Sequence, residues 1–245
     1  MPDLSAAATL DLWEAARELR PVERALALAA AGEPVGAEEL ARLPLGRRDA
    51  RILELHEALA GRELDATAAC PACGEQAEFA VDADELLARD ADSQRTAPVE
   101  ADGFVVHWRP PDSRDVAAAA QRGDAAAAER TLLARCVTSA TGPDGVVDAT
   151  ALPGNVRGEV SRAMGDADPL AEVLVDVVCP ACDTEFVADL DVGAFVWAEV
   201  HGRAQRLLHE VDVLARAYGW TETEVLALGD RRREAYLTLA GEVGG

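Results

Sequence analysis

The sequence predicts an α+β protein in which helical N- and C-terminal regions lie around two β-hairpins. Apolar residues recur at helical spacing near both ends of the chain. In between, the tetrapeptide Cys-Pro-Ala-Cys occurs twice, at residues 70–73 and 179–182, and each copy is flanked by strand-like sequence. We therefore expect a helical region over 1–62, an α+β region with a helical insertion over 63–191 and a helical region over 192–245, together in one compact domain.

The N-terminal region should contain a helix pair or one kinked helix, then a short helix and a longer one. Apolar side chains recur at helical spacing over residues 10–31, and Pro21 is well placed to begin a second segment. The short helix is expected over 37–42. The longer one, over 47–60, should stop at Gly61, because glycine readily adopts the backbone conformation that ends a helix.

The first Cys-Pro-Ala-Cys copy lies at the turn of a predicted hairpin. Residues 63–70 and 76–81 alternate with a period of two on either side of it. Residues 82–100 are polar and acidic, and their pattern predicts no regular element. Residues 104–109 alternate again and predict a strand, which the following Pro-Pro pair ends because proline cannot donate to a sheet.

The insertion should continue with helices. Asp112 or Ser113 is placed to cap one of them, and the alanine-rich residues 124–135 predict another. Residues 141–145 indicate a loop or turn from their glycine, proline and aspartate content. A further helix is expected over 155–164.

The second Cys-Pro-Ala-Cys copy also lies between two predicted strands. Residues 170–178 are apolar and β-branched, and residues 185–190 pair back from the turn. The two hairpins are expected to be neighbours, with the insertion as an excursion that leaves and returns to the same point.

The C-terminal region returns to helical periodicity. A long helix from Val192 should end at Gly219. Thr221 and Glu224 then fit a capping box at the start of the next helix, and Asp230 is expected to cap the last one.

The two cysteine segments predict one metal site. A Cys-x-x-Cys pair aims two sulfurs at one point, and two pairs complete the tetrahedral sulfur shell that structural zinc prefers. We expect Cys70, Cys73, Cys179 and Cys182 to hold one structural Zn²⁺ and to join the hairpins into a zinc-ribbon-like core. Three alternatives stay open, namely a redox dithiol, two separate disulfides, and cysteines that merely pack in the interior.

The surroundings of the cysteines favour the metal. A thioredoxin-like site needs a cysteine pair between the strand and helix of a βαβ unit, whereas strand-like sequence follows both pairs here. Disulfides need an oxidising compartment, and no apolar signal segment opens the sequence. A shell of four sulfurs leaves zinc no open position for water, so the metal would have a structural role and would not catalyse hydrolysis.

Composition argues against two classes of partner. The chain has 45 acidic and 23 basic residues and a formal charge of −22, which repels nucleic acid and anionic membrane surfaces. No apolar run approaches the roughly 20 residues that span a bilayer. We expect a cytoplasmic protein that neither binds nucleic acid nor inserts into membranes.

The remaining polar residues suggest no catalytic site. His201 and His209 lie two helical turns apart, too far to clasp one metal ion, and His56 and His107 have less context still. Cys136 is expected to be a small buried apolar residue. The sequence has no phosphate-binding loop, dinucleotide fingerprint or hydrolase motif, so we assign no catalytic residue and no small-molecule substrate.

Two arginine clusters stand out against the acidic background. They lie at Arg47, Arg48 and Arg51 and at residues 231–233. Arginines of this kind either form ion pairs with acidic residues of the same protein or contact an acidic partner, and both interpretations stay open.

Several blocks, taken in order along nearly the whole chain, resemble a known family. They are Leu12-Trp13-Glu14, Arg24-Ala25-Leu26, the segment Leu43-Pro44-Leu45-Gly46-Arg47-Arg48-Asp49, the paired Cys-Pro-Ala-Cys segments and Ala217-Tyr218-Gly219-Trp220. The chain resembles the T-even-type phage baseplate hub assembly chaperone family, in the zinc-ribbon form associated with bacterial contractile injection systems.

The resemblance implies a non-enzymatic assembly factor or structural subunit of the baseplate hub of a contractile phage tail or injection system. It implies protein partners from a baseplate hub, spike or tail tube, and a cytoplasmic protein that is either free or incorporated in an assembled tail-like particle. Only the four cysteines carry over as a site. The rival hypotheses are a zinc-stabilised cytoplasmic adaptor or regulatory protein unrelated to tails, and a dithiol oxidoreductase.

Overall fold

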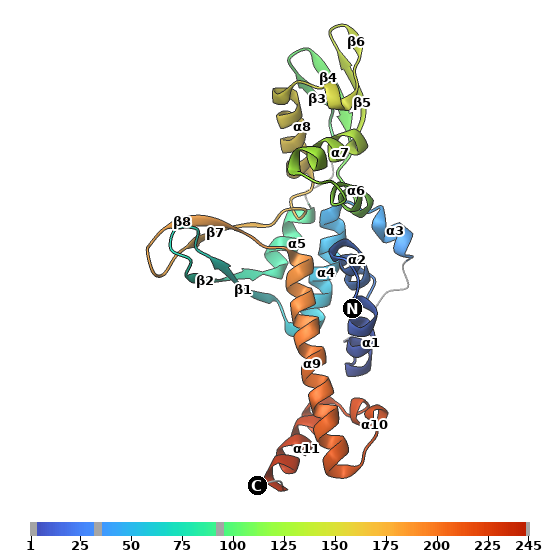
Figure 1. Cartoon of the computed structure of the whole chain (residues 1–245), viewed down its shortest axis with the longest axis vertical. Helices are drawn as coiled ribbons and strands as arrows, with labels where there is room; N and C mark the ends of the chain where they lie inside the picture. The colour runs from blue at the N-terminus through green and yellow to red at the C-terminus, as the bar shows by residue number, and fades with distance from the viewer. Residues whose placement is uncertain (1–3, 32–35, 92–95, 244–245) are drawn as a thin grey trace.

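The computed structural model of the chain describes residues 4–31, 36–91 and 96–243. Figure 1 shows a long column made mainly of helices, with a slender β-stranded arm that leaves the middle of the column on one side. The fold is mixed α/β, and its described strands form small antiparallel sheets of two, four and two strands. Among these residues, no helix has the length and apolar character needed to cross a membrane.

A bundle of helices forms the middle of the column and surrounds the largest apolar cluster. The bundle contains α1 (Ala6–Ala16), α2 (Pro21–Ala29), the short α3 (Ala37–Ala41), α4 (Leu45–Ala60), α5 (Ala83–Ala91) and the first part of α9 (Val192–Tyr218). Its fully buried large side chains include Leu28, Ile52, Leu53, Leu55, Leu86, Val196 and Val200. Burial of each such side chain contributes about 1.5–3 kcal/mol, so this cluster is the main source of stability.

Local sequence sets the helix ends in this bundle, and most predicted boundaries are confirmed to within a few residues. Pro21 is the first residue of α2. Gly61 follows α4 with a φ of 100°, and Gly219 follows α9 in the left-handed conformation with a φ of 72°. At the other end of α9, the Asp191 carboxylate accepts a hydrogen bond from the Ala194 N–H at 2.8 Å.

The arm consists of two antiparallel hairpins that pack face to face. β1 (Glu63–Ala69) pairs with β2 (Gln76–Asp82), and β7 (Leu174–Val178) pairs with β8 (Glu185–Asp189). Their facing side chains form a thin apolar layer of Ala68, Ala77, Phe79, Val175, Val177, Phe186 and Ala188. Because each strand exposes alternate residues on opposite faces, each hairpin also keeps an outer face toward solvent.

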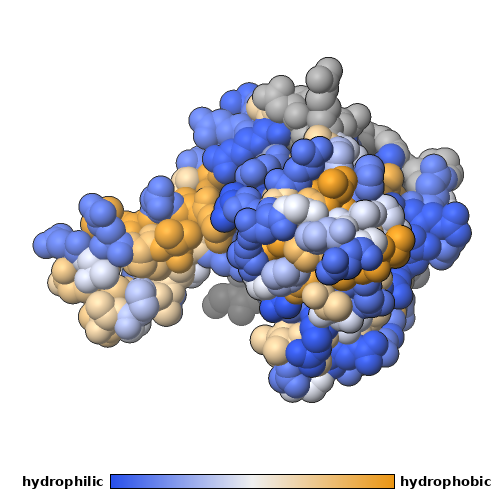
Figure 2. All heavy atoms as spheres, turned by 90° about the horizontal axis from the view of Figure 1, so that it is seen from above, coloured by the Kyte–Doolittle hydropathy of each residue, from blue (hydrophilic) through white to orange (hydrophobic). Residues whose placement is uncertain are grey.

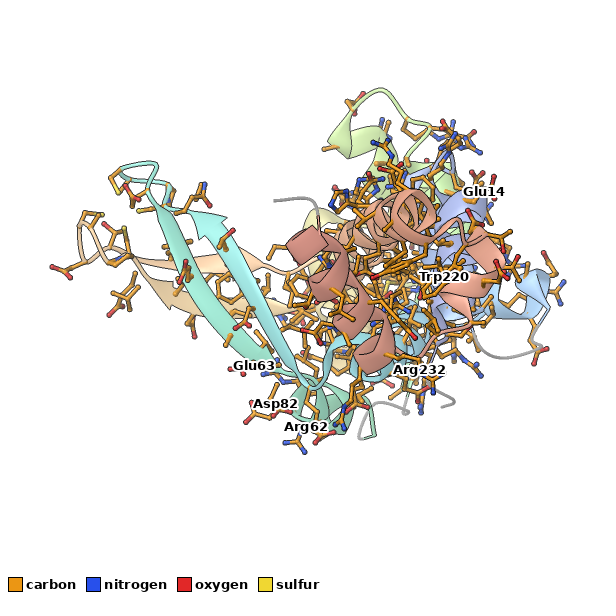
Figure 3. All side chains as sticks on the ribbon, turned by 90° about the horizontal axis from the view of Figure 1, so that it is seen from below. Glu14, Arg62, Glu63, Asp82, Trp220 and Arg232 are labelled. Carbon is orange, nitrogen blue, oxygen red and sulfur yellow. The ribbon has the colours of Figure 1, made fainter. Side chains whose placement is uncertain are left out.

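An ion-pair cluster marks the point where the first hairpin joins the helices. The Arg62 guanidinium lies 3.3 Å from the Asp82 carboxylate and 2.7 Å from that of Asp84. Figure 3, which views the molecule from below, shows Arg62, Glu63 and Asp82 together at this end of the β1–β2 hairpin, with the turn of the hairpin far from the helices.

The chain between the hairpins builds a separate unit at one end of the column. Its four-stranded sheet has the order β3 (Val99–Ala101), β4 (Phe104–Trp108), β5 (Val137–Gly142) and β6 (Gly145–Val146), accompanied by α6 (Ser113–Ala119), α7 (Ala125–Cys136), a 3₁₀ turn (Ala149–Ala151) and α8 (Gly154–Ala167). The unit has its own buried cluster of Val106, Trp108, Leu133, Ala140, Leu152, Val156 and Val160. The predicted excursion between the cysteine pairs therefore has a core of its own.

Buried polar contacts attach this unit to the helical bundle. Both carboxylate oxygens of Asp168 accept the Gly46 N–H at 3.1 Å. A Cβ atom at position 46 would overlap that carboxylate, which explains the glycine at the start of α4. Two residues on in α4, Arg48 donates to the Ser113 hydroxyl at 3.4 Å. These contacts fix the start of α4 against the first residue of α6 and against the segment that follows α8.

The last two helices pack against the second half of α9 at the other end of the column. They are α10 (Glu222–Leu226) and α11 (Asp230–Val243). The predicted capping box is confirmed, since the Thr221 hydroxyl accepts from the Glu224 N–H at 3.3 Å and the Glu224 carboxylate accepts from the Thr221 N–H at 2.8 Å. Asp230 is the first residue of α11 and not its cap.

The middle of the chain differs from the prediction in several places. Residues 83–91 form the helix α5, whose few apolar side chains were hidden in acidic sequence. The turn predicted within residues 141–145 lies at residues 143–144, but the residues on either side of it pair as the strands β5 and β6, which were not predicted. The strand β7 begins at Leu174 and not at residue 170, because the chain turns after Asp168. The paired hairpins also lie to the side of the helical bundle, whereas we expected them at the centre.

Candidate metal centre

The two cysteine segments form turns of the same geometry at the tips of the two hairpins. In the first, the Cys70 N–H donates to the Glu75 carbonyl at 2.8 Å and the Gly74 N–H donates to the Cys70 carbonyl at 2.9 Å. In the second, the Cys179 N–H donates to the Thr184 carbonyl at 2.9 Å. The repeated hydrogen bonds show that both segments close the hairpin in the same way.

Each turn needs one residue in the left-handed backbone conformation directly after its second cysteine. Gly74 has a φ of 79°, and Asp183 occupies the corresponding position with a φ of 57°. Glycine adopts this conformation without a steric penalty, and aspartate is one of the few other residues that tolerate it. The sequence repeat therefore extends one residue beyond Cys-Pro-Ala-Cys in conformation, although not in identity.

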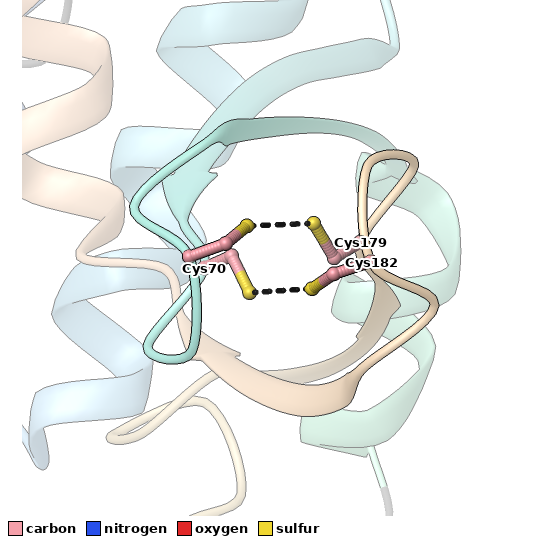
Figure 4. A group of neighbouring side chains, drawn as sticks. Cys70, Cys179 and Cys182 are labelled. Carbon is pink, nitrogen blue, oxygen red and sulfur yellow. Dashed lines mark hydrogen bonds between the residues drawn. The ribbon is translucent and has the colours of Figure 1, made fainter.

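The four predicted ligands lie together, as Figure 4 shows for the facing hairpin tips. The Cys70 and Cys182 sulfurs are 3.7 Å apart, the Cys73 and Cys179 sulfurs are 3.6 Å apart, and all four sulfurs lie within 4.8 Å of one another. Four sulfurs bound at about 2.3 Å to one zinc ion occupy the corners of a tetrahedron whose edges are about 3.8 Å. The donor set and its spacing therefore fit a single four-coordinate ion.

Each turn contributes one buried and one exposed cysteine. Cys70 and Cys179 are 2% and 0% exposed, whereas Cys73 and Cys182 face solvent. None of the four is joined to another in a disulfide. A metal ion can therefore enter from the exposed side and bind sulfurs that the inner side of each turn already holds in place.

The sulfurs influence one another's protonation. The Thr184 hydroxyl, 3.3 Å from the Cys182 sulfur, and the Thr184 N–H lower the pKa of Cys182 to about 6. At Cys73 a backbone hydrogen bond from Glu75 lowers the pKa, but contacts with the Cys182 and Cys179 sulfurs outweigh it and raise the pKa to about 12. Four sulfurs this close cannot all ionise without a cation among them. A bound metal ion would supply that positive charge.

Sequence reasoning identified the four cysteines but missed Thr184 and Asp183. The signal for Asp183 was its alignment with Gly74 in the repeat, since a position that holds glycine in one copy and aspartate in the other indicates a left-handed residue. Thr184 aligns with Glu75, so the contact of its hydroxyl with the Cys182 sulfur has no side-chain counterpart in the first copy. No pattern within the repeat could have revealed it.

The other candidate residues lie away from the cysteine cluster. Cys136 is buried, as expected, and its sulfur lies 3.7 Å from a carboxylate oxygen of Asp115. His56 is buried, and its Nδ1 lies 2.6 Å from a Glu199 carboxylate oxygen. On the outside of α9, the Nδ1 of His201 accepts a hydrogen bond from the Trp13 indole. Each of these groups holds two elements together.

Both arginine clusters contain members that form ion pairs within the protein. Arg48 forms an ion pair with Asp49 at 2.8 Å. Arg233 is buried between Glu210, at 2.5 Å, and Asp230, at 2.7 Å. Arg231 and Arg232 are exposed. One interpretation, pairing within the protein, is thus confirmed for at least one member of each cluster.

Comparison with protein families, with curated proteins and with solved structures finds no match to this chain.

Proposed function

We propose that the four cysteines hold one structural zinc ion and that the arm is a zinc-ribbon-like unit. The observation that carries the proposal is the single cluster of four sulfurs, spaced like the corners of a zinc tetrahedron, at the tips of hairpins far apart in the sequence. Tetrahedral sulfur sites suit zinc or iron. Zinc is our choice because a closed shell on a thin arm serves as a crosslink without redox chemistry.

The chemistry of such a site supports an architectural role. When all four positions around zinc are taken by cysteine, no position remains for a water molecule or substrate. The apolar layer between the hairpins is thin and consists largely of alanine and valine, so a crosslink at the tip would contribute much of the order of the arm. We therefore propose a non-enzymatic role for the protein.

We further propose that the protein acts in the cytoplasm as an assembly factor or structural subunit of the baseplate hub of a contractile tail or injection system. The support is the ordered resemblance described above, together with the positions of its blocks. Arg24 stacks over the Trp197 ring at 4.7 Å within the helical bundle, and Gly46 is packed against Asp168, which attaches the insertion to the bundle. Such residues are expected to be shared by proteins of the same fold.

The proposed role is tested by association with specific tail proteins. The hub, spike and tube proteins encoded beside this chain are produced individually, mixed with the zinc-loaded protein, and analysed by size-exclusion chromatography and calorimetry. We expect a stable complex with at least one hub or spike protein. If none of them binds, or if no tail genes lie beside this one, the baseplate role is wrong and an adaptor unrelated to tails becomes the better hypothesis.

A further inference from the structure

The two hairpins of the arm present different outer faces to solvent. The outer face of the β1–β2 hairpin has only polar or small side chains, namely Glu63, Asp65, Thr67, Ala69, Gln76, Glu78 and Ala80. The β7–β8 outer face consists of Leu174, Asp176, Val178, Glu185, Val187 and Asp189. Its three aliphatic side chains are 49%, 58% and 57% exposed for Leu174, Val178 and Val187. Figure 2 views the molecule from above and shows apolar surface along this side of the arm.

Strand register arranges these side chains in a definite pattern. Val187 lies opposite Asp176 and is therefore diagonal to both Leu174 and Val178, at a Cβ separation of roughly 7–8 Å. The three aliphatic side chains thus form one continuous strip across the hairpin. Single exposed aliphatic residues are ordinary on protein surfaces, but a strip on one face of a thin sheet indicates contact with another molecule.

A carboxylate stands beside each aliphatic side chain of the strip. The register pairs Leu174 with Asp189, Asp176 with Val187, and Val178 with Glu185, which places one acidic and one apolar residue in every cross-strand pair. Within the described part of the chain, these three carboxylates form no ion pair. The face therefore combines apolar contact area with unneutralised negative charge.

The charge decides which occupant the face suits. A second copy of the same face would bring carboxylates against carboxylates, in a protein whose formal charge is −22. Anionic lipid is disfavoured for the same reason. A protein surface on which arginine or lysine side chains flank aliphatic or aromatic ones would bury the strip and neutralise the acidic residues.

We propose that the β7–β8 outer face is the docking surface for a partner protein of this basic and apolar chemistry. The proposal deepens the proposed function, because it names the binding surface and the partner's chemistry, and it rests on that function only for the choice of tail proteins to test. Zinc at the tip would hold this hairpin rigid against β1–β2 and so present the face in one conformation.

The first experiment does not depend on tail proteins. A displayed library of random peptides is selected on the zinc-loaded protein, and the selected peptides are then measured on the L174T/V178T/V187T variant, in which threonine keeps the β-propensity of the strands. We expect enrichment of peptides that combine arginine or lysine with aliphatic residues. Their Kd should rise about tenfold or more in this variant. Added salt should raise the Kd for the wild type, whereas D176N/E185Q/D189N should bind more weakly and depend less on salt. Val146→Thr, at an exposed valine of β6, and D65N/E78Q, on the other hairpin, should leave the Kd unchanged.

Zinc content and thermal unfolding of every variant show whether the arm is intact. The proposal is overturned if selected peptides bind the wild type and L174T/V178T/V187T equally, or if no basic and apolar peptides are enriched. It is also overturned if the wild type forms a dimer that this variant abolishes, since a second copy would then be the occupant, or if vesicles of anionic phospholipid bind the wild type through the same residues.

The second experiment uses the tail protein that binds in the association test. Its affinity should fall about tenfold in L174T/V178T/V187T and stay unchanged in Val146→Thr. If the tail protein binds the variant as tightly as the wild type, the proposed function stands and the proposed docking surface is wrong. If no tail protein binds while basic peptides still need the strip, the surface stands and the baseplate role is wrong.

Discussion

The most densely bonded side chain of the insertion is Asp115, and it is completely buried. Its carboxylate accepts hydrogen bonds from Arg109 at 2.6 Å, from Arg135 at 2.7 Å and from the Asp112 N–H at 2.9 Å. Burial alone would raise the pKa of this carboxyl, but the hydrogen bonds and the nearby positive charge outweigh burial and hold the pKa well below its usual range. The ionised carboxylate is thus a structural part of the unit.

Replacement of Asp115 tests that statement. Asp115→Asn should lower the free energy of unfolding at pH 7 by roughly 3 kcal/mol, because it removes the charge that three partners share. A carboxyl whose pKa is lowered by folding stabilises the folded state at a pH above its unfolded pKa of about 3.9. This stabilisation is lost as the pH falls through the folded-state pKa. The acid-induced loss should therefore be smaller in the variant. Urea unfolding at several pH values measures both effects, with the exposed Asp144→Asn as control.

His56 predicts a pH dependence of opposite sign. Burial alone would lower its pKa, but the hydrogen bond and charge of Glu199 outweigh burial and raise the pKa above 6.5. A histidine whose pKa is raised by folding stabilises the folded state fully at a pH below its unfolded pKa of about 6.5. This stabilisation is lost as the pH rises through the folded-state pKa. Glu199→Gln should flatten the fall in unfolding free energy above neutral pH. His209→Gln, at an exposed position of α9, should leave the slope as in the wild type.

At the turn of the first hairpin, Gly74 is constrained by its φ of 79° and not by space, since a Cβ would meet no neighbour. Gly74→Ala should cost about 1 kcal/mol, equivalent to about fivefold weaker zinc binding, because alanine is strained in this conformation. Gly74→Asp should be better tolerated, since Asp183 adopts the corresponding conformation in the second turn. Zinc competition with a coloured chelator measures both. Equal affinities for the two variants would contradict this account of the turn.

At the scale of elements, the metal should couple the two hairpins. Cys179→Ala is expected to remove all the metal and to increase hydrogen exchange in β1 and β2, although the substitution lies in the other hairpin. The reason is that neither turn can hold zinc with two sulfurs while the apolar layer between the hairpins is so thin. Cys136→Ala, outside the site, should retain full zinc content. Half-occupancy in Cys179→Ala would indicate that each turn binds a metal by itself.

Elements with strong local signals were predictable from sequence. Helices with a clear apolar face and a defined end were found, because the residues that end them act locally, as Gly61 and Gly219 do. The helix α5 was missed because its acidic residues obscured the few apolar side chains that reach the core. The turn of the β5–β6 hairpin is predicted by its composition, but the two strands beside it gave no signal because they are short and rich in small residues.

The ligands of the candidate site could be predicted from the sequence, but the contacts between distant segments that position the arm could not. The repeated Cys-Pro-Ala-Cys predicted the four ligands, because the metal chemistry requires that residue type at that spacing. The position of the arm outside the helical bundle was not predictable, since it follows from the insertion's own core and from contacts such as that between Gly46 and Asp168. The difference between the two outer faces likewise emerged only once the strand register was known.

In the whole molecule, the metal site and the apolar clusters stabilise different parts of the chain. The main cluster of the helical bundle and the cluster of the insertion do not include the cysteines. A chelator should therefore loosen the arm while the helical content measured by circular dichroism stays nearly unchanged. Loss of most helical signal on chelation would show that the metal supports the entire fold.

The metal content of the protein purified without added metal, measured together with a count of reactive thiols, distinguishes a zinc site from a redox dithiol. We expect one zinc per chain, with Cys70, Cys73, Cys179 and Cys182 protected until a chelator releases all four together. Protein free of zinc, whose thiols cycle between reduced and disulfide forms, would contradict this expectation and point to redox chemistry at the same four sulfurs.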